Sequence, residues 1–321
     1  MEKYYVVGAQ QKNGIYKDWE QYQKGVILKV FPEQNLAEKC VEYVSPKEVI
    51  PDIFPSISFT AATIKNDHLY VGTQTEILVY SLPNFQKVGY LSYPCFNDIH
   101  HVLPTSEGNF LVVNTGLDMV LEISPQGNIL KEWHVFGENI WRKFSRSIDY
   151  RKVPTTKPHQ SHPNFVFQIG NDIWATRCLQ EDAICLTKPN QQINIGGEKV
   201  HDGIVFGDSI YFTQVNGQVV KVNIHTLKVE QKFNLNNFTN TGKNLGWCRG
   251  INVLDEHKVI VGFTRIRPYK KYQADGTIIP EGNYGTLPTR IACYDLKHGK
   301  LLWEQQLEDY DLNAIYSIHK A

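Results

Sequence analysis

A repeat of about 40 residues constrains the fold of this chain more than any other feature of its sequence. Four segments show the same order of three short apolar strands separated by polar or glycine turns: 68–91, 109–135, 172–195 and 209–235. One more apolar strand precedes each segment, at 61–66, 100–104, 164–169 and 203–208. Four-stranded units that recur at this spacing are typical of the blades of a β-propeller.

Two further units complete the predicted ring. Residues 249–307 contain another blade with a long insertion, and residues 4–44 contain only three strands. The missing innermost strand lies at the other end of the chain, at 312–320. The sequence therefore predicts an all-β, six-bladed propeller that forms one domain over 1–321, with the C-terminal strand closing the ring against the N-terminal blade. A β-sandwich is the alternative, but it does not explain six similar units with complementary incomplete ends.

Three long loops interrupt the compact repeats, at 9–24, 136–160 and 264–289. In a propeller, the loops between the second and third strands of a blade emerge on the same face as the loops between blades. All three loops are therefore predicted to lie on one face. Loops of this length in a compact fold are usually functional or disordered, and their convergence on one face favours function.

Two of these loops are basic in a chain whose 33 basic and 33 acidic residues balance. A positive rim around a concave mouth attracts anions, and arginine suits the bidentate capture of phosphate, sulfate or carboxylate. The candidate substrate-binding residues on this face are Arg146, Arg151, Lys157, Asn164, Arg265 and Arg267. The alternative interpretation is that these charges are simply solvated loop residues.

The innermost strands are predicted to begin at the same face, around the mouth of the central channel. Side chains at equivalent first positions of successive blades then converge, and the candidate metal ligands among them are His101, His162, His201 and Cys248. Imidazole and thiolate together suit zinc, iron or copper. His101 fits this register only if its strand holds an extra residue or two, and Cys248 could equally be a small residue packed beneath Trp247.

Three further residues near the mouth are candidate catalytic groups: Asp202, Arg249 and His159. Asp202 could orient an imidazole or act as a general base, or it could serve only to form the turn before Gly203. Asp98 and Asp118 also lie near the predicted mouth. The histidines are equally compatible with a metal-free polar or anion-binding pocket, or with a structural role alone.

Several other classes of function are disfavoured. A neutral chain lacks the charge that a dedicated nucleic-acid-binding protein needs for phosphate neutralisation. The sequence contains no P-loop, GxGxxG or GxSxG motif, so no nucleotide cofactor is indicated. The six cysteines lack CxxC spacing, no signal peptide is recognisable, and no stretch reaches the roughly 18 apolar residues of a membrane span. These features predict a cytoplasmic protein without a membrane partner.

The blade pattern resembles the six-bladed propellers of the gluconolactonase and strictosidine synthase type. Histidines from separate inner strands also resemble the peptidyl-hydroxyglycine lyase propeller, in which such residues hold zinc; this likeness implies a ligand role only for His101, His162 and His201. The motifs HDG (201–203), GWCRG (246–250) and GFTRIR (262–267), followed by TRIACYDL, resemble a group of uncharacterised bacterial propeller proteins over about residues 57–300.

The sequence thus leads to two hypotheses. The first is a metal-assisted enzyme, a lyase, hydrolase or oxidase, that acts on a small anionic molecule in a histidine-rich pocket with an arginine rim. The second is a non-catalytic binding module that uses the same face for a protein or glycan partner.

Overall fold

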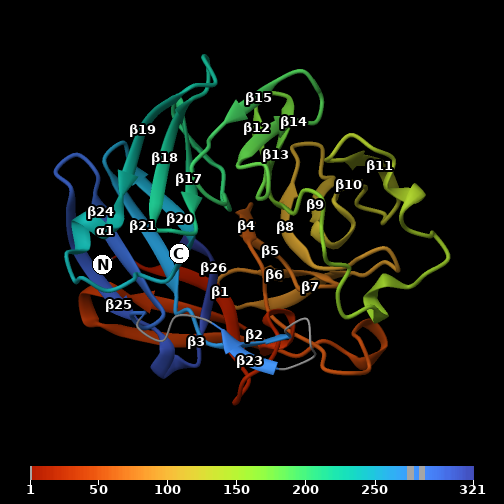
Figure 1. Ribbon diagram of the computed structural model, residues 1–321, viewed down its shortest axis with the longest axis horizontal. Helices are drawn as coiled ribbons and strands as arrows, with labels where there is room; N and C mark the ends of the chain where they lie inside the picture. Colours follow the sequence, from red (N-terminus) through yellow and green to blue (C-terminus); the bar gives the residue numbers. More distant parts are fainter. Residues whose placement is uncertain (1, 273–277, 282–285) are drawn as a thin grey trace.

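The computed structural model describes residues 2–272, 278–281 and 286–321 and contains six four-stranded antiparallel sheets that follow one another around a common centre (Figure 1). The prediction of an all-β, six-bladed propeller is confirmed. Within the predicted insertion 264–289, residues 273–277 and 282–285 lie outside the described residues.

Each of the first three blades runs from an innermost strand at the centre to an outermost strand at the periphery. Blade 1 consists, in this order, of β26 (Ala314–Lys320), β1 (Tyr4–Gln11), β2 (Tyr22–Phe31) and β3 (Leu36–Tyr43). Blade 2 consists of β4 (Ala62–Lys65), β5 (His68–Gly72), β6 (Ile77–Ser81) and β7 (Gln86–Leu91). Blade 3 consists of β8 (Ile99–Pro104), β9 (Phe110–Asn114), β10 (Met119–Ile123) and β11 (Ile129–His134).

The other three blades follow the same order. Blade 4 consists of β12 (Pro163–Ile169), β13 (Asp172–Arg177), β14 (Asp182–Cys185) and β15 (Gln192–Asn194). Blade 5 consists of β16 (Ile204–Phe206), β17 (Ser209–Gln214), β18 (Gln218–Asn223) and β19 (Val229–Asn234). Blade 6 consists of β20 (Trp247–Asp255), β21 (Lys258–Thr264), β24 (Arg290–Asp295) and β25 (Lys300–Gln306), and the hairpin of β22 (Tyr269–Tyr272) and β23 (Ile278–Glu281) lies between β21 and β24 in the sequence.

The ring is closed by its C-terminal strand. β26 pairs antiparallel with β1, with Tyr4 opposite Lys320 and Ala9 opposite Ala314. β26 also contacts the innermost strands of both neighbouring blades, β4 and β20. The two ends of the chain therefore complete one blade together, as the incomplete terminal units predicted.

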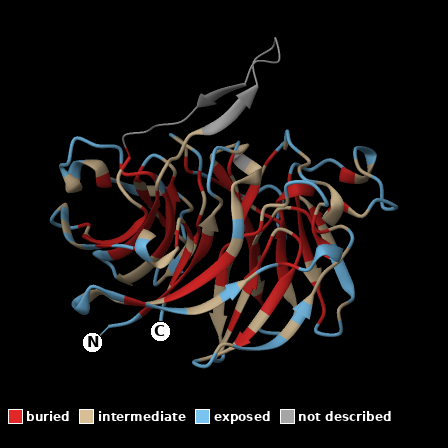
Figure 2. Ribbon diagram, turned by 90° about the horizontal axis from the view of Figure 1, so that it is seen from below, coloured by how far each residue is buried: buried red, intermediate tan, exposed pale blue. Residues whose placement is uncertain are grey.

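The core lies between the blades rather than inside any one sheet. Tyr4 and Val6 of β1 pack against blade 6, whereas Tyr5 and Val7 pack against blade 2. Because successive side chains of a strand point to opposite faces, and both faces are covered here, the strand reads as a continuous apolar run. Figure 2 shows the buried positions along the strands and the exposed positions mainly in the turns.

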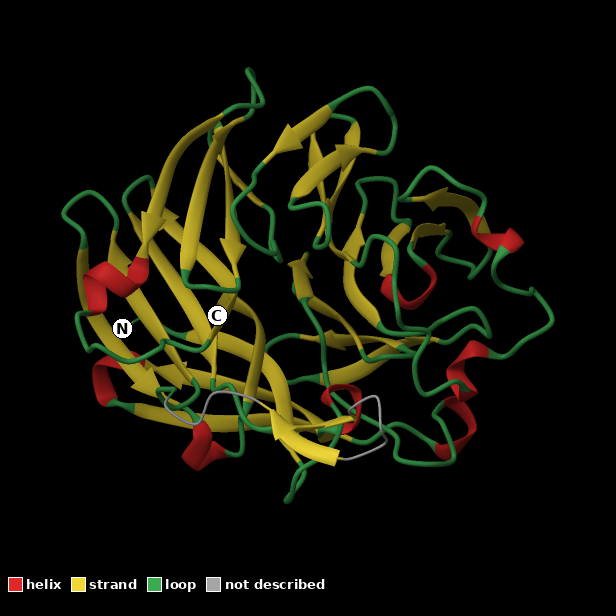
Figure 3. Cartoon of the chain, viewed as in Figure 1, coloured by secondary structure: helices red, strands yellow, loops and turns green. Residues whose placement is uncertain are grey.

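Helices are short and peripheral (Figure 3). The described part of the chain contains α1 (Leu235–Thr239) and the 3-10 turns η1 (Asp18–Glu20), η2 (Pro32–Gln34), η3 (Lys47–Val49), η4 (Thr115–Leu117), η5 (Ile140–Arg142), η6 (Tyr150–Lys152) and η7 (Glu308–Tyr310). Among the described residues, no helix has the length and apolar character needed to cross a membrane.

Two of the three predicted long loops meet in the structure. The Lys157 ammonium in the loop between blades 3 and 4 lies 5.7 Å from the centre of the Trp19 ring, in the loop between β1 and β2. Lys152 in the first of these loops also donates to the carbonyl of Lys47 and pairs with Asp52. The loop between blades 3 and 4 is thereby fixed against the segments beside blade 1.

Candidate functional site

A small pocket at the mouth of the channel receives residues from all six blades. Its cavity volume is about 20 Å³, room for roughly one water-sized group. The lining residues, in blade order from blade 1, are Tyr316, Ala61, His100, Asn164, Phe165, His201, Asp202 and Arg249. The convergence of innermost strands that the sequence predicted is therefore present, and we call this cavity the mouth pocket.

Bulges in the innermost strands bring several of these side chains into the mouth pocket. The pairing register shifts around His100 in β8, around Asn164 in β12, around Arg249 in β20 and around Tyr316 in β26. An extra residue in one strand of a pair changes the direction of its side chain, and such bulges are common beside active sites. Gly250 follows Arg249 with φ of +79°, a conformation that glycine adopts readily.

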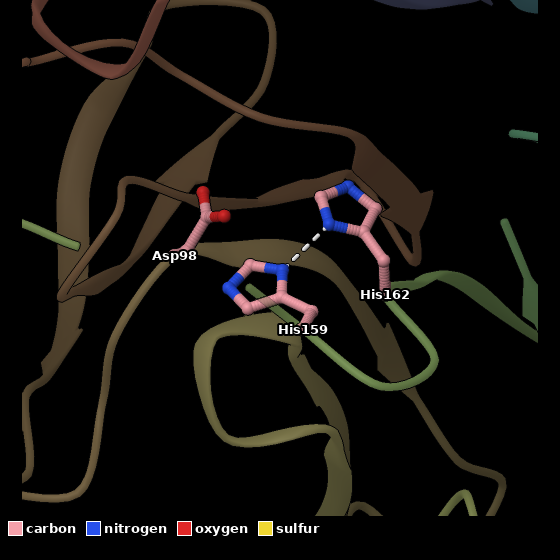
Figure 4. A group of neighbouring side chains, drawn as sticks. All are labelled: Asp98, His159 and His162. Carbon is pink, nitrogen blue, oxygen red and sulfur yellow. Dashed lines mark hydrogen bonds between the residues drawn. The ribbon is translucent and has the colours of Figure 1, made fainter. Parts of the chain in front are cut away.

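Asp98, His159 and His162 form a half-buried group beside the mouth pocket (Figure 4). One ligand atom from each residue lies within 4.8 Å of the others. The Nδ1 atoms of the two histidines are 2.7 Å apart, a hydrogen bond in which one of them carries the proton. One carboxylate and two imidazoles are a common ligand set for zinc and for non-haem iron.

A single carboxylate holds the loop that carries both histidines. Asp118 follows η4 and accepts backbone N–H bonds from Gln160, Ser161 and His162 at 2.7, 3.0 and 2.7 Å. These bonds support His162 at φ of +54°, a left-handed conformation that is uncommon for a residue other than glycine. The loop is thus fixed by its backbone, and the two imidazoles are held near each other as a consequence.

His100 connects this group to the mouth pocket. The amide nitrogen of Asn164 donates to the carbonyl of Val200, so its oxygen faces His100 and accepts from His100 Nδ1 at 2.7 Å. The other ring nitrogen, Nε2, lies 3.2 Å from an oxygen of Asp98. Both ring nitrogens of His100 therefore contact an oxygen atom, one from the amide of Asn164 and one from the carboxylate of Asp98.

The charges in this region follow from burial and from these contacts. Burial would raise the pKa of Asp98, but His100, together with His162 and His159, holds it well below its usual range. Burial lowers the pKa of His159 and takes that of His162 well below its usual value. Neutral imidazoles have free lone pairs, so these two side chains suit metal binding.

Arg249 and His201 bring unpartnered groups to the mouth pocket. The guanidinium of Arg249 lies over the ring of Tyr316, 4.0 Å from its centre, and 5.5 Å from that of Trp247. Among the described residues, no hydrogen bond or ion pair involves this guanidinium, and its Nε is fully buried. Burial, with Arg249 and His100 nearby, takes the pKa of His201 well below its usual value.

Asp202 is buried beside them but is held by other partners. Its carboxylate accepts from the hydroxyl of Thr213 and, at 2.9 Å, from the backbone N–H of Gly250. Burial raises its pKa to about 6, although these hydrogen bonds and Arg249 oppose the shift. Asp202 therefore ties the entry of blade 5 to the bulge of blade 6.

Of the four predicted metal ligands, the group of potential ligands contains only His162; His201 lines the mouth pocket instead, and His101 and Cys248 lie elsewhere. His101 stacks on Phe165 with ring centres 3.6 Å apart, and both its nitrogens are occupied, by the hydroxyl of Thr63 and the N–H of Val166. Because β8 bulges at His100, that residue takes the channel position and His101 turns toward the blade 4 strand. Cys248 is fully buried in the core between blades 5 and 6, and burial raises the pKa of its thiol well above the usual value.

The arginines of the predicted rim are paired with carboxylates, and their role in substrate binding stays a prediction. Arg146 binds Glu132 with two bonds of 2.9 and 2.7 Å, and Arg151 binds Asp149 with two of 2.8 and 2.7 Å. Arg265 and Arg267 share Glu308. Of the other two predicted substrate-binding residues, Lys157 contacts Trp19, and Asn164 lines the mouth pocket while it positions His100.

Two residues that organise this region, His100 and Tyr316, had no site role predicted from the sequence, whereas Asp98 and Asp118 were expected near the mouth as possible members of acid pairs. The tandem pair His100-His101 did contain a signal, since alternation allows only one of two successive side chains to face the channel. No comparable signal in the sequence pointed to Tyr316. The candidate catalytic residue His159 lies within the group of potential metal ligands instead.

No protein-family model matches this sequence, and a search of curated proteins finds no match. A protein of unknown function from Bacteroides caccae has a similar structure over 100% of this chain and 99% of its own, with a TM-score of 0.63 and 11% identity. A virginiamycin B lyase from Staphylococcus aureus, solved with quinupristin, aligns over 76% of this chain and 80% of its own (TM-score 0.44, 12% identity), and a streptogramin B lyase over 78% and 83% (0.45, 13%). The likeness to the Bacteroides protein agrees, at the level of the fold, with the expected resemblance to uncharacterised bacterial propellers.

Proposed function

We propose that this protein is a metal-assisted enzyme that binds a divalent transition metal ion through Asp98, His159 and His162 and acts on a small anionic substrate in the adjoining mouth pocket. The observation that carries the proposal is the juxtaposition of two features. A group with one carboxylate and two imidazoles lies beside a pocket lined by Arg249, and His100 belongs to both, since it lines the pocket and pairs with Asp98.

The three residues fit a metal ion after a small adjustment. Two imidazole nitrogens that bind zinc at 2.0–2.1 Å in tetrahedral geometry are about 3.3 Å apart. The Nδ1 atoms of His159 and His162 are 2.7 Å apart, so the rings would separate by roughly 0.6 Å as the ion replaces the shared proton. Side-chain rotation alone can supply a movement of this size.

The surrounding residues have the arrangement that metal centres require. His100 bonds one oxygen of Asp98 and leaves the other available, which is how an outer residue orients a carboxylate ligand. Asp118 fixes the loop of the two histidines through three backbone bonds. A bound ion would supply a Lewis acid beside the pocket. Burial takes the pKa of His201 well below its usual value, and its ring forms no hydrogen bond within the described part of the chain, so it is available to hydrogen-bond a substrate there.

Metal content tests this proposal. The protein is stripped with EDTA, reloaded with Zn²⁺ and analysed for bound metal per chain. We expect one ion per chain in the native sequence and at least a 10- to 100-fold loss of affinity in His162→Ala and Asp98→Asn. His225→Ala is the matched control, because His225 also pairs with an aspartate, Asp208, but on the surface.

Two results would contradict the proposal. One is a native protein that binds no metal, or a His162→Ala variant that binds metal as the native protein does. The other concerns catalysis, for which a panel of small anionic esters is screened with loaded and stripped protein. Turnover that survives complete removal of the metal would rule out metal assistance.

A further inference from the structure

Arg249 is an isolated cation in the wall of the mouth pocket. Only 8% of its surface is exposed, and its Nε is buried without a partner among the described residues. Over the same part of the chain, no carboxylate forms an ion pair with its guanidinium. A buried charge without a partner costs several kcal/mol, so its presence indicates a group that completes it.

The surroundings of Arg249 restrict how that group can approach. The guanidinium lies over the Tyr316 ring, with the Trp247 ring also within cation–π distance. A guanidinium stacked on an aromatic ring can still donate hydrogen bonds along its edge, in its own plane. Two parallel N–H groups along that edge match the two oxygens of a carboxylate.

The pocket beside Arg249 is small, and the acidic residue among its lining residues, Asp202, has hydrogen-bond partners of its own. Its cavity of about 20 Å³ has room for roughly one water-sized group, so a flat carboxylate would enter with less side-chain movement than a bulkier tetrahedral anion. Asp202 directs its carboxylate to Thr213 and Gly250 and forms no ion pair with Arg249. His201 lines the same pocket and has nitrogen atoms available to hydrogen-bond a carboxylate.

We propose that Arg249 and His201 form an anion subsite that binds one carboxylate group of the substrate. This proposal rests on the proposed function for its place beside the metal group, and it refines the substrate class from a small anion to a small carboxylic acid. The other part of the molecule would extend from the mouth pocket toward Asp98, His159 and His162, which His100 connects to the pocket.

Carboxylate binding is measured on EDTA-treated, full-length protein, so that no metal contributes. Acetate is titrated in a calorimeter, with acetamide as a neutral probe of the same shape and inorganic phosphate as a tetrahedral anion. We expect saturable binding of acetate, weaker binding of phosphate and none of acetamide. Arg249→Met should weaken acetate binding about 10- to 100-fold, because it removes charge-assisted hydrogen bonds.

Two other variants complete the test. Arg249→Lys retains a charge but not the planar fork, so it should bind acetate less tightly than the native protein, and it remains informative if Arg249→Met fails to fold. Arg146→Met is the matched control, since Arg146 also lies over an aromatic ring, 4.1 Å from the centre of Trp141, but is paired with Glu132. It should bind acetate normally.

The results separate this inference from the proposed function. If acetate binding depends on Arg249 but no metal binds, the subsite stands and the metal-assisted mechanism is wrong. If metal binds but acetate does not, or binds equally well to Arg249→Met and Arg249→Lys, the subsite is wrong. Tighter binding of phosphate than of acetate would contradict the carboxylate class.

Discussion

The arginines of the rim and the arginine of the mouth pocket have opposite environments. On the rim, Arg146, Arg151 and Arg265 each form two hydrogen bonds with a carboxylate, and Arg267 forms one. In the mouth pocket, Arg249 has aromatic neighbours and no anionic partner among the described residues. The four rim arginines are thus paired with carboxylates, whereas the arginine of the mouth pocket is not.

This difference shows that the number of basic residues in a loop is a poor guide to anion binding. The rim pairs connect loops to strands and turns: Glu132 belongs to β11, and Glu308 belongs to η7. They stabilise the position of the loops and leave little charge for a ligand. In the mouth pocket, Asp202 and His100 are held by hydrogen bonds or ion pairs, whereas the guanidinium of Arg249 has no such partner among the described residues.

Asp118→Asn should have the largest effect, because it removes the backbone support on which the mouth depends. The carboxylate accepts three N–H bonds from residues 160–162, and an amide leaves part of these donors unpaired. Each buried donor without a partner costs about 1–3 kcal/mol. We expect the free energy of unfolding, measured by urea denaturation, to fall by about 1–3 kcal/mol, together with loss of metal binding.

Asp208→Asn provides the control for this variant. Asp208 is an exposed aspartate whose carboxylate pairs with His225 on the surface, so its substitution should change stability by less than about 0.5 kcal/mol. A small loss of stability in Asp118→Asn, with metal binding intact, would mean that the conformation of His162 is set by other contacts.

The dependence of stability on pH should differ in sign between the two regions. Burial raises the pKa of Asp202 to about 6, so the folded state holds this proton more tightly than the unfolded state, and the resulting stability is lost as pH rises through about 6. Burial would raise the pKa of Glu308, but the bonds from Arg265 and Thr289 outweigh it and lower this pKa. The stability that the ionised Glu308 gives to the folded state is therefore lost as pH falls.

Two variants measured from neutral pH to about pH 4 separate these effects. Relative to Asp202→Asn, the native protein should gain about 2 kcal/mol as pH falls, because the buried carboxylate becomes neutral. Relative to Glu308→Gln, the native protein should keep its advantage until about pH 4.5 and begin to lose it at the acid end of this interval. If the stability difference between the native protein and each variant changed with pH in the same direction for both, the distinction between a paired rim and an unpaired mouth would be wrong.

The propeller could be predicted from the sequence because the prediction rests on a strand-and-turn pattern that is repeated over many residues. Six units with the same order of apolar strands and turns remain recognisable even when single positions vary, and the incomplete ends at 4–44 and 312–320 predicted the closure. The sequence also located the start of each innermost strand. His201, Asp202 and Arg249 lie at such positions, were expected near the channel, and line the mouth pocket.

The remaining details depend on single-residue register and on contacts between distant segments. A bulge at His100 exchanges the faces of two adjacent histidines, and nothing in a four-strand repeat fixes where such a bulge occurs. The pairing of Arg146 with Glu132, and of Arg265 with Glu308, joins residues 14 and 43 positions apart. Local composition made these loops look basic, whereas the folded structure pairs several of their arginines with carboxylates.

The smallest expected effect distinguishes a structural arginine from one retained for a ligand. Arg265→Met leaves Arg267 as the arginine partner of Glu308, so the free energy of unfolding should fall by about 1–2 kcal/mol. Arg249→Met removes the cation–π contacts but also the desolvation penalty of an unpaired charge, and these terms oppose each other. We expect its stability, measured by the same urea titration, to be unchanged or to rise by up to about 1 kcal/mol. A loss as large as that of Arg265→Met would show that Arg249 stabilises the fold, because a residue kept for a ligand should weaken the empty protein rather than strengthen it.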